Sequence, residues 1–252
     1  MTEADLHRIA VYTELALGAA TIIAVSFITA PYGRHTRKGF GPAIPQRLAW
    51  VLMEAPAVLV WGAIYLMGDH RADAAPLAIL SLWMLHYVQR TFVFPFRIRS
   101  EGKTTPVFVV LSAVVFNLLN AYVNARWVSH FGVYDSGWLA DPRFLIGATM
   151  FLAGWALNIQ ADNVLLRLRA PGETGYKVPR GGLYEFISCP NYFAEILEWC
   201  GWAVLTWSLA GASFALYTIA NLAPRAIAHH RWYKEKFADY PPNRRALVPF
   251  VI

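Results

Sequence analysis

Seven long apolar segments limit most strongly how this chain can fold. They run at roughly residues 9–30, 48–67, 76–96, 106–129, 144–165, 192–209 and 212–232. A helix needs about 20 mostly apolar residues to cross the hydrocarbon layer of a membrane. Because lipid cannot satisfy backbone hydrogen bonds, such segments cross as helices. We therefore predict an all-α, polytopic membrane protein built as a bundle of seven transmembrane helices.

The composition supports this class. Hydrophobic residues make up 57% of the chain and charged residues only 15%, whereas soluble domains carry about 25% charged residues. Ten Trp and twelve Tyr suit the aromatic belts at membrane interfaces. The two cysteines, Cys189 and Cys200, cannot form a disulfide framework, and no Cys/His spacing typical of zinc appears. We expect no metal site.

Basic residues are distributed unevenly between the connections. Most of the 22 Lys and Arg residues lie in the first, third and fifth connections and in the C-terminal tail, which seven spans place on one side. Basic residues are retained on the cytoplasmic side of membranes. The pattern predicts a cytosolic C-terminus and an N-terminus outside. The net charge of +6 therefore reflects topology, and we expect no nucleic-acid partner.

No internal repeat or change of composition divides the chain, so we expect a single integral-membrane domain over residues 1–252. The acidic N-terminus, with Glu3 and Asp5, is unlike a cleavable signal peptide. Arg outnumbers Lys and Ala is frequent, which favours a bacterial source. The predicted location is a bacterial inner membrane, or the endoplasmic reticulum of a eukaryote. A monomer is compatible with the sequence, which leaves the oligomeric state open.

A polar stripe interrupts the sixth apolar segment. At about 100° per residue, Asn191, Glu195 and Glu198 fall on one helical face. Carboxylates inside a membrane are costly and usually face an internal cavity or a partner. We interpret Asn191 and Glu195 as part of a ligand site. Glu198 is interpreted as a structural partner for a neighbouring helix.

Four further polar sets share helical faces toward the predicted cytosolic ends. Singly, each can be explained by packing or by the membrane interface, but together they predict one ligand cavity that opens to the cytosol. Their Arg side chains suit phosphates, and Asn and Asp can bind an amide or a ribose. A phosphorylated nucleotide therefore fits, although no Gly-x-Gly-x-x-Gly or Walker motif is present. The sets are Trp50 with Glu54; Tyr87 with Arg90; Asn158, Asp162 and Arg169; and Arg225, His229 and Tyr233.

Seven sequence blocks, taken together, resemble the steroid 5α-reductase family (3-oxo-5α-steroid 4-dehydrogenases). They include Leu85-His-Tyr-x-x-Arg90-Thr-Phe-Val93, and the likeness extends over nearly the whole chain. The C-terminal blocks alone are less specific, because enoyl and polyprenol reductases and isoprenylcysteine methyltransferases share parts of them. The blocks lie at 32–36, 50–56, 85–93, 171–184, 191–199, 225–233 and 237–250.

The resemblance implies NADPH-dependent reduction of the Δ4 double bond of a 3-oxo steroid that enters from the bilayer. In this family a Glu and a Tyr hold the 3-keto oxygen, and they match Glu54 and Tyr87. Glu54 is expected to be protonated, because burial disfavours its charge. Hydride is then expected at C5. Trp50, Met53 and Trp199 are expected to contact the steroid; Met53 stands where the family often has Gln.

The resemblance also implies contacts to NADPH, most of them in the C-terminal part of the chain, about residues 100–252. Lys103 is included although the local length differs from the family pattern. The expected contacts are Arg90, Lys103, Asn158, Asp162, Arg169, Tyr176, Asn191, Glu195, Arg225, His229 and Tyr233.

Three other functions stay open at this point. A related membrane reductase can act on another enoyl or polyprenol lipid. An isoprenylcysteine-type methyltransferase is the second alternative, although its reaction does not need residues such as Glu54 and Tyr87 to polarise a carbonyl group. A seven-helix receptor or transporter would bind no nicotinamide, so a bound cofactor would exclude it.

Overall fold

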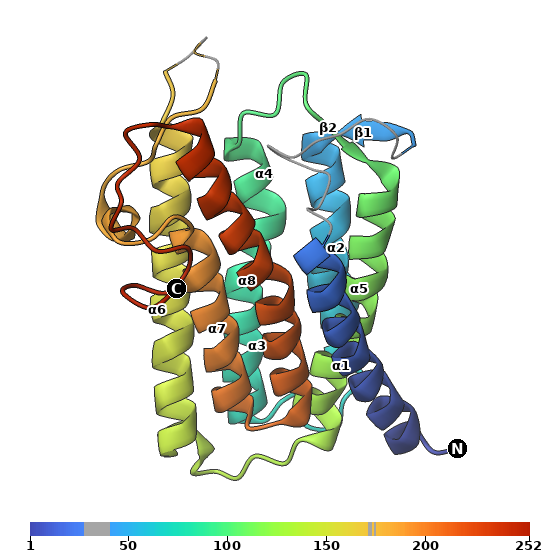
Figure 1. Cartoon of the computed structure of the whole chain (residues 1–252). Coiled ribbons are helices and arrows are strands. Elements are labelled where there is room, and N and C mark those ends of the chain that lie inside the picture. The colour runs from blue at the N-terminus through green and yellow to red at the C-terminus, as the bar shows by residue number, and fades with distance from the viewer. Residues whose placement is uncertain (28–40, 171–172, 174) are drawn as a thin grey trace.

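The computed structural model describes residues 1–27, 41–170, 173 and 175–252. The predicted block at 32–36 therefore lies outside the described residues, as do positions 171, 172 and 174 of the block at 171–184. The backbone forms seven long helical segments that stand side by side as a bundle (Figure 1). These segments are α1 (Glu3–Phe27), α2 (Gln46–Leu66), α3 to α4 (Ala74–Arg97), α5 with η3 (Val107–Phe131), α6 (Pro142–Arg167), α7 (Pro190–Thr206) and α8 (Leu209–Lys236).

The predicted class, an all-α multi-pass membrane protein, is confirmed, and the described residues form seven long helical segments. Among the described residues, five of the helices are long and apolar enough to cross a membrane. These five are α1, α2, the α3–α4 segment, α5 with η3, and α6. The other two are α7, with only 17 residues, and α8, which carries the polar set Arg225, His229 and Tyr233.

The boundary between the last two helices differs from the prediction. The apolar run suggested that the sixth helix reaches residue 209, but α7 ends at Thr206. Trp207 adopts a left-handed conformation with φ 44°, which ends the helix. Ser208 then caps α8, because its hydroxyl accepts the Gly211 N–H at 2.9 Å. An apolar pattern does not show such a tight turn, since one serine between Trp207 and Leu209 scarcely interrupts it.

Glycines bring α6 and α7 into close contact. A Cβ added at Gly154 would lie 2.5 Å from the Glu198 backbone nitrogen, and one at Gly147 would lie 2.4 Å from that of Leu205. On α7, a Cβ at Gly201 would lie 2.5 Å from the Phe151 nitrogen. Small residues of this kind let membrane helices approach backbone to backbone. The α6–α7 contact therefore fixes the height and rotation of the polar stripe on α7.

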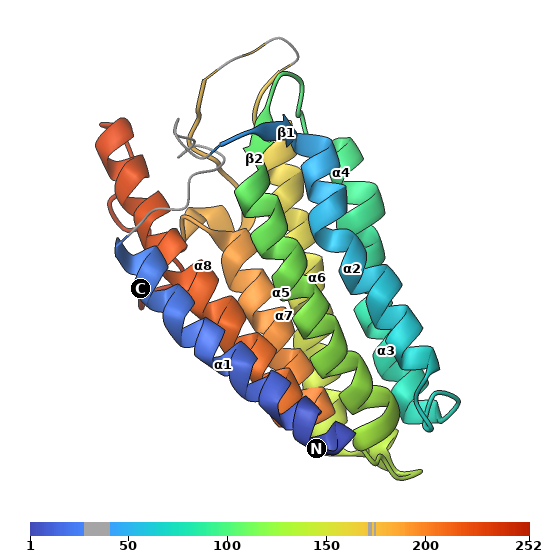
Figure 2. The ribbon, with the colours of Figure 1, turned by 90° about the vertical axis from the view of Figure 1, so that its right-hand side faces the viewer.

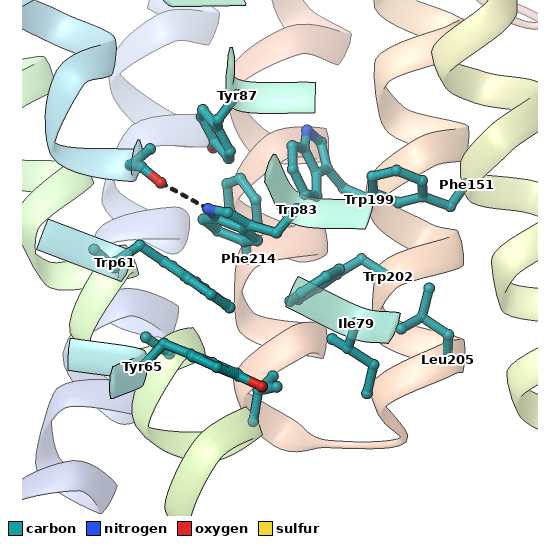
Figure 3. Packing of buried hydrophobic residues seen from close by; sticks show 14 of the residues in the cluster. Trp61, Tyr65, Ile79, Trp83, Tyr87, Phe151, Trp199, Trp202, Leu205 and Phe214 are labelled. Atoms are coloured by element: carbon teal, nitrogen blue, oxygen red, sulfur yellow. Dashed lines mark hydrogen bonds between the residues drawn. The ribbon is translucent and has the colours of Figure 1, made fainter. Parts of the chain in front are cut away.

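A buried aromatic cluster joins α2, α3 and α7 in the middle of the bundle (Figure 3). Trp83 stacks on Trp61 with ring centroids 5.1 Å apart and contacts Trp202 at 4.9 Å. Its indole N–H donates to the Ala57 carbonyl at 2.7 Å, so the buried polar atom is satisfied. Tyr87 lies at the edge of this cluster, 4.7 Å from Trp83 between ring centroids. The cluster thus gives the candidate catalytic tyrosine a fixed support.

Two short features close the ends of the bundle. Strands β1 (Ala43–Pro45) and β2 (Thr104–Pro106) form an antiparallel pair at the end where α2 and α5 begin (Figure 1). The C-terminal tail packs back on the loop before α7, where Ser188 N donates to the Arg245 carbonyl at 2.8 Å. The short strands were not predicted, because three residues carry no periodicity.

Candidate active site

Arg90 connects four helices. It lies in η2 (Gln89–Val93), a π-helical turn between α3 and α4; such turns often occur at functional sites. Its Nη1 donates to Asp162 Oδ2 on α6 at 3.0 Å, and its Nη2 lies 3.7 Å from Glu195 Oε2 on α7. The guanidinium also stands 5.0 Å from the ring centroid of Trp50 on α2. Four residues predicted from separate polar sets therefore meet at one point.

Glu54 and Tyr87 lie beside this cluster. Glu54 follows Trp50 by one turn of α2, and the Trp50 indole N–H donates to the Arg90 carbonyl at 3.2 Å. Three residues further along α2, the Ala57 carbonyl accepts the Trp83 indole N–H at 2.7 Å, so the parts of α2 and α3 that carry Glu54 and Tyr87 lie side by side. The Tyr87 ring is buried and lies 5.6 Å from the Trp199 ring between centroids. The two residues predicted to bind a ketone thus lie between the two hydrogen bonds that join α2 to the α3–α4 segment.

Asn117 on α5 supports the backbone next to Glu54. Its amide donates to the Met53 carbonyl at 2.6 Å, and its side chain is within hydrogen-bond reach of the Glu54 carboxyl. Asn117 was not predicted as a site residue, although a polar residue inside an apolar span was a signal. The Asn117 amide therefore lies near Glu54, although Met53, at the position where the family often has Gln, has no amide in its side chain.

The polar set on α6 divides into two environments. The Asn158 amide donates to the Asn191 carbonyl at 3.0 Å, which ties α6 to the first turn of α7. Asp162 pairs with Arg90. Arg169 instead donates to the Gly175 carbonyl at 3.1 Å, in the loop beyond the helix. The common helical face predicted for Asp162 and Arg169 is wrong for Arg169, because α6 ends at Arg167 and Arg169 lies beyond its C-cap, Leu168.

Lys103 and Arg169 lie in the same region above the helices. The Lys103 ammonium donates to the Arg99 carbonyl at 2.8 Å. Burial, together with the positive charge of Arg169, lowers the pKa of Lys103. Two cations that repel each other outside the bundle can both be stabilised by an anion such as a phosphate.

The α8 set contacts α7 and the C-terminal tail. The Arg225 guanidinium lies 5.5 Å from the ring centroid of Tyr192, and the Tyr192 hydroxyl is 3.1 Å from His229 Nε2. Tyr233 stacks on Tyr240 with centroids 5.4 Å apart. Tyr192 was not predicted, although it follows Asn191 directly.

Tyr176 extends the aromatic group on α8, because its ring packs edge-on against Trp232 at 4.9 Å between centroids. In the preceding chain, Gly181 and Gly182 have φ values of 92° and 56°, conformations that favour glycine. The turn into η5 (Gly182–Glu185) therefore accounts for this glycine pair without a ligand.

Comparison with known proteins decides the family. A family model described as 3-oxo-5-alpha-steroid 4-dehydrogenase matches residues 103–252. A protein from Bos taurus named 3-oxo-5-alpha-steroid 4-dehydrogenase 1 is 43% identical over 249 residues, covering 96% of this chain and 95% of its own. The chain belongs to the steroid 5α-reductase family. This confirms the family resemblance found in the sequence blocks.

Plant and human members of the steroid 5α-reductase family are equally similar. The Steroid 5-alpha-reductase DET2 of Gossypium hirsutum is 44% identical over 255 residues, with 99% of each chain covered. The human 3-oxo-5-alpha-steroid 4-dehydrogenase 1 is 40% identical over 244 residues, covering 95% of this chain and 93% of its own. These full-length relatives extend the match to α2 and α3, which precede the region of the family model.

The sequence of this steroid 5α-reductase family member did not indicate one close contact near the site. His86 Nδ1 lies 2.7 Å from Glu198 Oε1, and both side chains are buried. The prediction that Glu198 pairs with a neighbouring helix is therefore confirmed, with α3 as that helix. No local pattern could name the partner, because the two residues are 112 positions apart.

Proposed function

We propose that this protein is a 3-oxo-5α-steroid 4-dehydrogenase, which reduces the C4–C5 double bond of 3-oxo-Δ4 steroids. The observation that carries the proposal is the position of Glu54 and Tyr87, on adjoining stretches of α2 and α3 beside the Arg90 cluster. A neutral carboxyl and a phenol are both donors that can bind a ketone oxygen. The names of the full-length relatives support the same reaction.

Steroid 5α-reductases generally use NADPH, and the residue types here fit that cofactor. Lys103 and Arg169 suit phosphate. Asn191 and Glu195, at the start of α7, suit the carboxamide of a nicotinamide. We assign the full expected contact set to NADPH, with Arg225, His229 and Tyr233 along α8 and Tyr176 near their end. When bound, the cofactor supplies the hydride that C5 receives.

Glu54 and Tyr87 act on the substrate ketone. The Glu54 carboxyl in its neutral form and the Tyr87 hydroxyl donate hydrogen bonds to the 3-keto oxygen. Conjugation transmits this polarisation to C5, and the developing enolate is stabilised as in an oxyanion hole, worth roughly 3–4 kcal/mol per donor. C4 then takes a proton from water. Trp50, Met53 and Trp199 form the apolar surroundings of the steroid rings.

Asn117 can take the role of the Gln that the family often places before the glutamate. Its amide already contacts the Met53 carbonyl and reaches the Glu54 carboxyl. A hydrogen bond from this amide would orient Glu54 toward the ketone. Met53 would then shape the steroid site by its bulk and not by hydrogen bonding.

The chain is an integral multi-pass membrane protein, and its steroid is proposed to enter from the bilayer. A cytosolic C-terminus and an external N-terminus follow from the basic residues. We assign most of the NADPH site to about residues 100–252 of one domain, which covers the whole chain. A bacterial inner membrane stays a prediction from composition alone, since the relatives above are animal and plant proteins.

NADPH oxidation by the purified protein tests the proposal. The panel contains 3-oxo-Δ4 steroids, enoyl thioesters and polyprenals. We expect consumption with the steroids and formation of the 5α-reduced ketone. Consumption with only the other lipids would instead assign a different enoyl substrate, and no consumption with any of them would contradict a reductase.

A further inference from the structure

Two pairs of consecutive residues face each other across the contact between α3 and α7. His86 and Tyr87 stand on α3, and Glu198 and Trp199 stand on α7. The first members of the pairs share a hydrogen bond of 2.7 Å, and the second members are in ring contact at 5.6 Å. Figure 3 shows Tyr87 above Trp83, with Trp199 beside them.

The His86 ring touches both aromatic side chains. Its centroid lies 4.8 Å from that of Tyr87 and 4.7 Å from that of Trp199, in edge-on geometry in both cases. Any rotation of the imidazole would therefore displace the phenol assigned to the ketone and the indole assigned to the steroid rings. The hydrogen bond to Glu198 prevents that rotation.

Glu198 is itself held by its surroundings. It is 0% exposed, and its backbone lies directly against Gly154 of α6. Its Oε1 is hydrogen-bonded to His86 Nδ1, whereas its Oε2 is buried without a hydrogen-bond partner in the described part of the chain. A buried pair of this kind is weak evidence for stability, because desolvation offsets the attraction. Because the pair lies against Tyr87 and Trp199, we infer a role other than stability.

We propose that the Glu198–His86 pair is a positioning device that holds Tyr87 and Trp199 in the geometry needed for reduction of the steroid. This inference rests on the function proposed above. Neither residue contacts the ketone in this account; each acts through its neighbour. The pair therefore affects the rate of the chemical step and leaves the binding of NADPH unchanged.

The test is a double-mutant cycle on steroid reduction. We expect H86A and E198A each to lower kcat by about 10²-fold, since small misplacements of catalytic groups have effects of that size. E198Q should recover most of the rate, because its amide can still hydrogen-bond to His86. In a Y87F background, H86A should lower the residual rate far less, because the group that it positions is already absent.

His7 provides the matched control. It is also a buried histidine, and its Nε2 donates to the Val123 carbonyl at 2.8 Å, between α1 and α5. H7A should therefore leave kcat unchanged. The positioning role is overturned if H86A behaves like H7A, or if H86A lowers the rate equally with Tyr87 and with Phe at that position. If E198A does not fold, the double-mutant cycle of H86A with Y87F tests the positioning role by itself. An inactive wild-type protein would instead overturn the proposed function itself.

Discussion

Two helix contacts, α6–α7 and α1–α8, each bury an acidic residue completely, yet only one lies at the candidate site. Glu198 on α7 pairs with His86, and Glu14 on α1 accepts a hydrogen bond from the Ser213 hydroxyl of α8 at 2.7 Å. Figure 2 shows α1 running along α8. Both carboxyls keep one oxygen without a partner in the described residues. Burial of an acid alone therefore does not identify a site.

The two contacts differ in how closely the backbones approach. Between α6 and α7, an added Cβ at Gly154 would lie 2.5 Å from a backbone nitrogen. Between α1 and α8, an added Cβ at Gly18 would be 3.6 Å from the Tyr217 Cα, which is ordinary contact. The site residues Asn158, Asp162 and Glu195 are on the tightly packed pair. A rigid contact suits residues that must hold a ligand to within a fraction of an ångström.

The largest expected effect is a difference in kcat between variants of Glu54 and of Glu14. E54Q and Y87F should each lower kcat for steroid reduction by about 10²- to 10³-fold, because each removes or weakens a donor to the ketone oxygen. E14Q should leave kcat unchanged, since its side chain lies between α1 and α8. Steady-state kinetics and NADPH titration measure both. Near-normal rates for E54Q and Y87F together would refute the assigned catalytic roles.

The second expected effect is a difference in stability between variants of Gly154 and of Gly18. G154A should destabilise the protein by about 1–3 kcal/mol, because the added methyl group meets backbone that cannot move aside. G18A should be neutral or up to about 1 kcal/mol stabilising, since Ala favours helix more than Gly. Thermal unfolding in detergent measures the difference. If both variants gave the same melting temperature, the two helix contacts would not differ in tightness.

The third expected effect concerns Ser213 and is confined to stability. S213A removes the donor to Glu14 Oε2 and should cost about 1–3 kcal/mol of stability, because a buried acceptor loses its partner. Activity of the folded fraction should not change. A loss of kcat without a loss of stability would place the α1–α8 contact in the active site, contrary to this account.

Much of the fold could be predicted because apolar length is a direct physical requirement of a membrane. The seven helices follow from it, whereas the left-handed turn at Trp207 and the strands β1 and β2 do not. Polar residues in apolar segments also indicated the candidate site, since such residues need a cavity or a partner. The sequence could not show which of these polar residues pair with one another. Arg90, for example, donates to Asp162, which lies 72 positions away along the chain. Packing of distant helices decides such contacts.

Isotope transfer tests whether the hydride of the cofactor reaches C5 of the steroid. The protein is incubated with a 3-oxo-Δ4 steroid and NADPH deuterated at C4 of the nicotinamide, and the product is analysed by mass spectrometry and NMR. The account predicts one deuterium at C5, on the α face, in a product whose 3-keto group is intact, and a large loss of this product with E54Q. An unreduced steroid, or deuterium at C3 or C4 in place of C5, would contradict it.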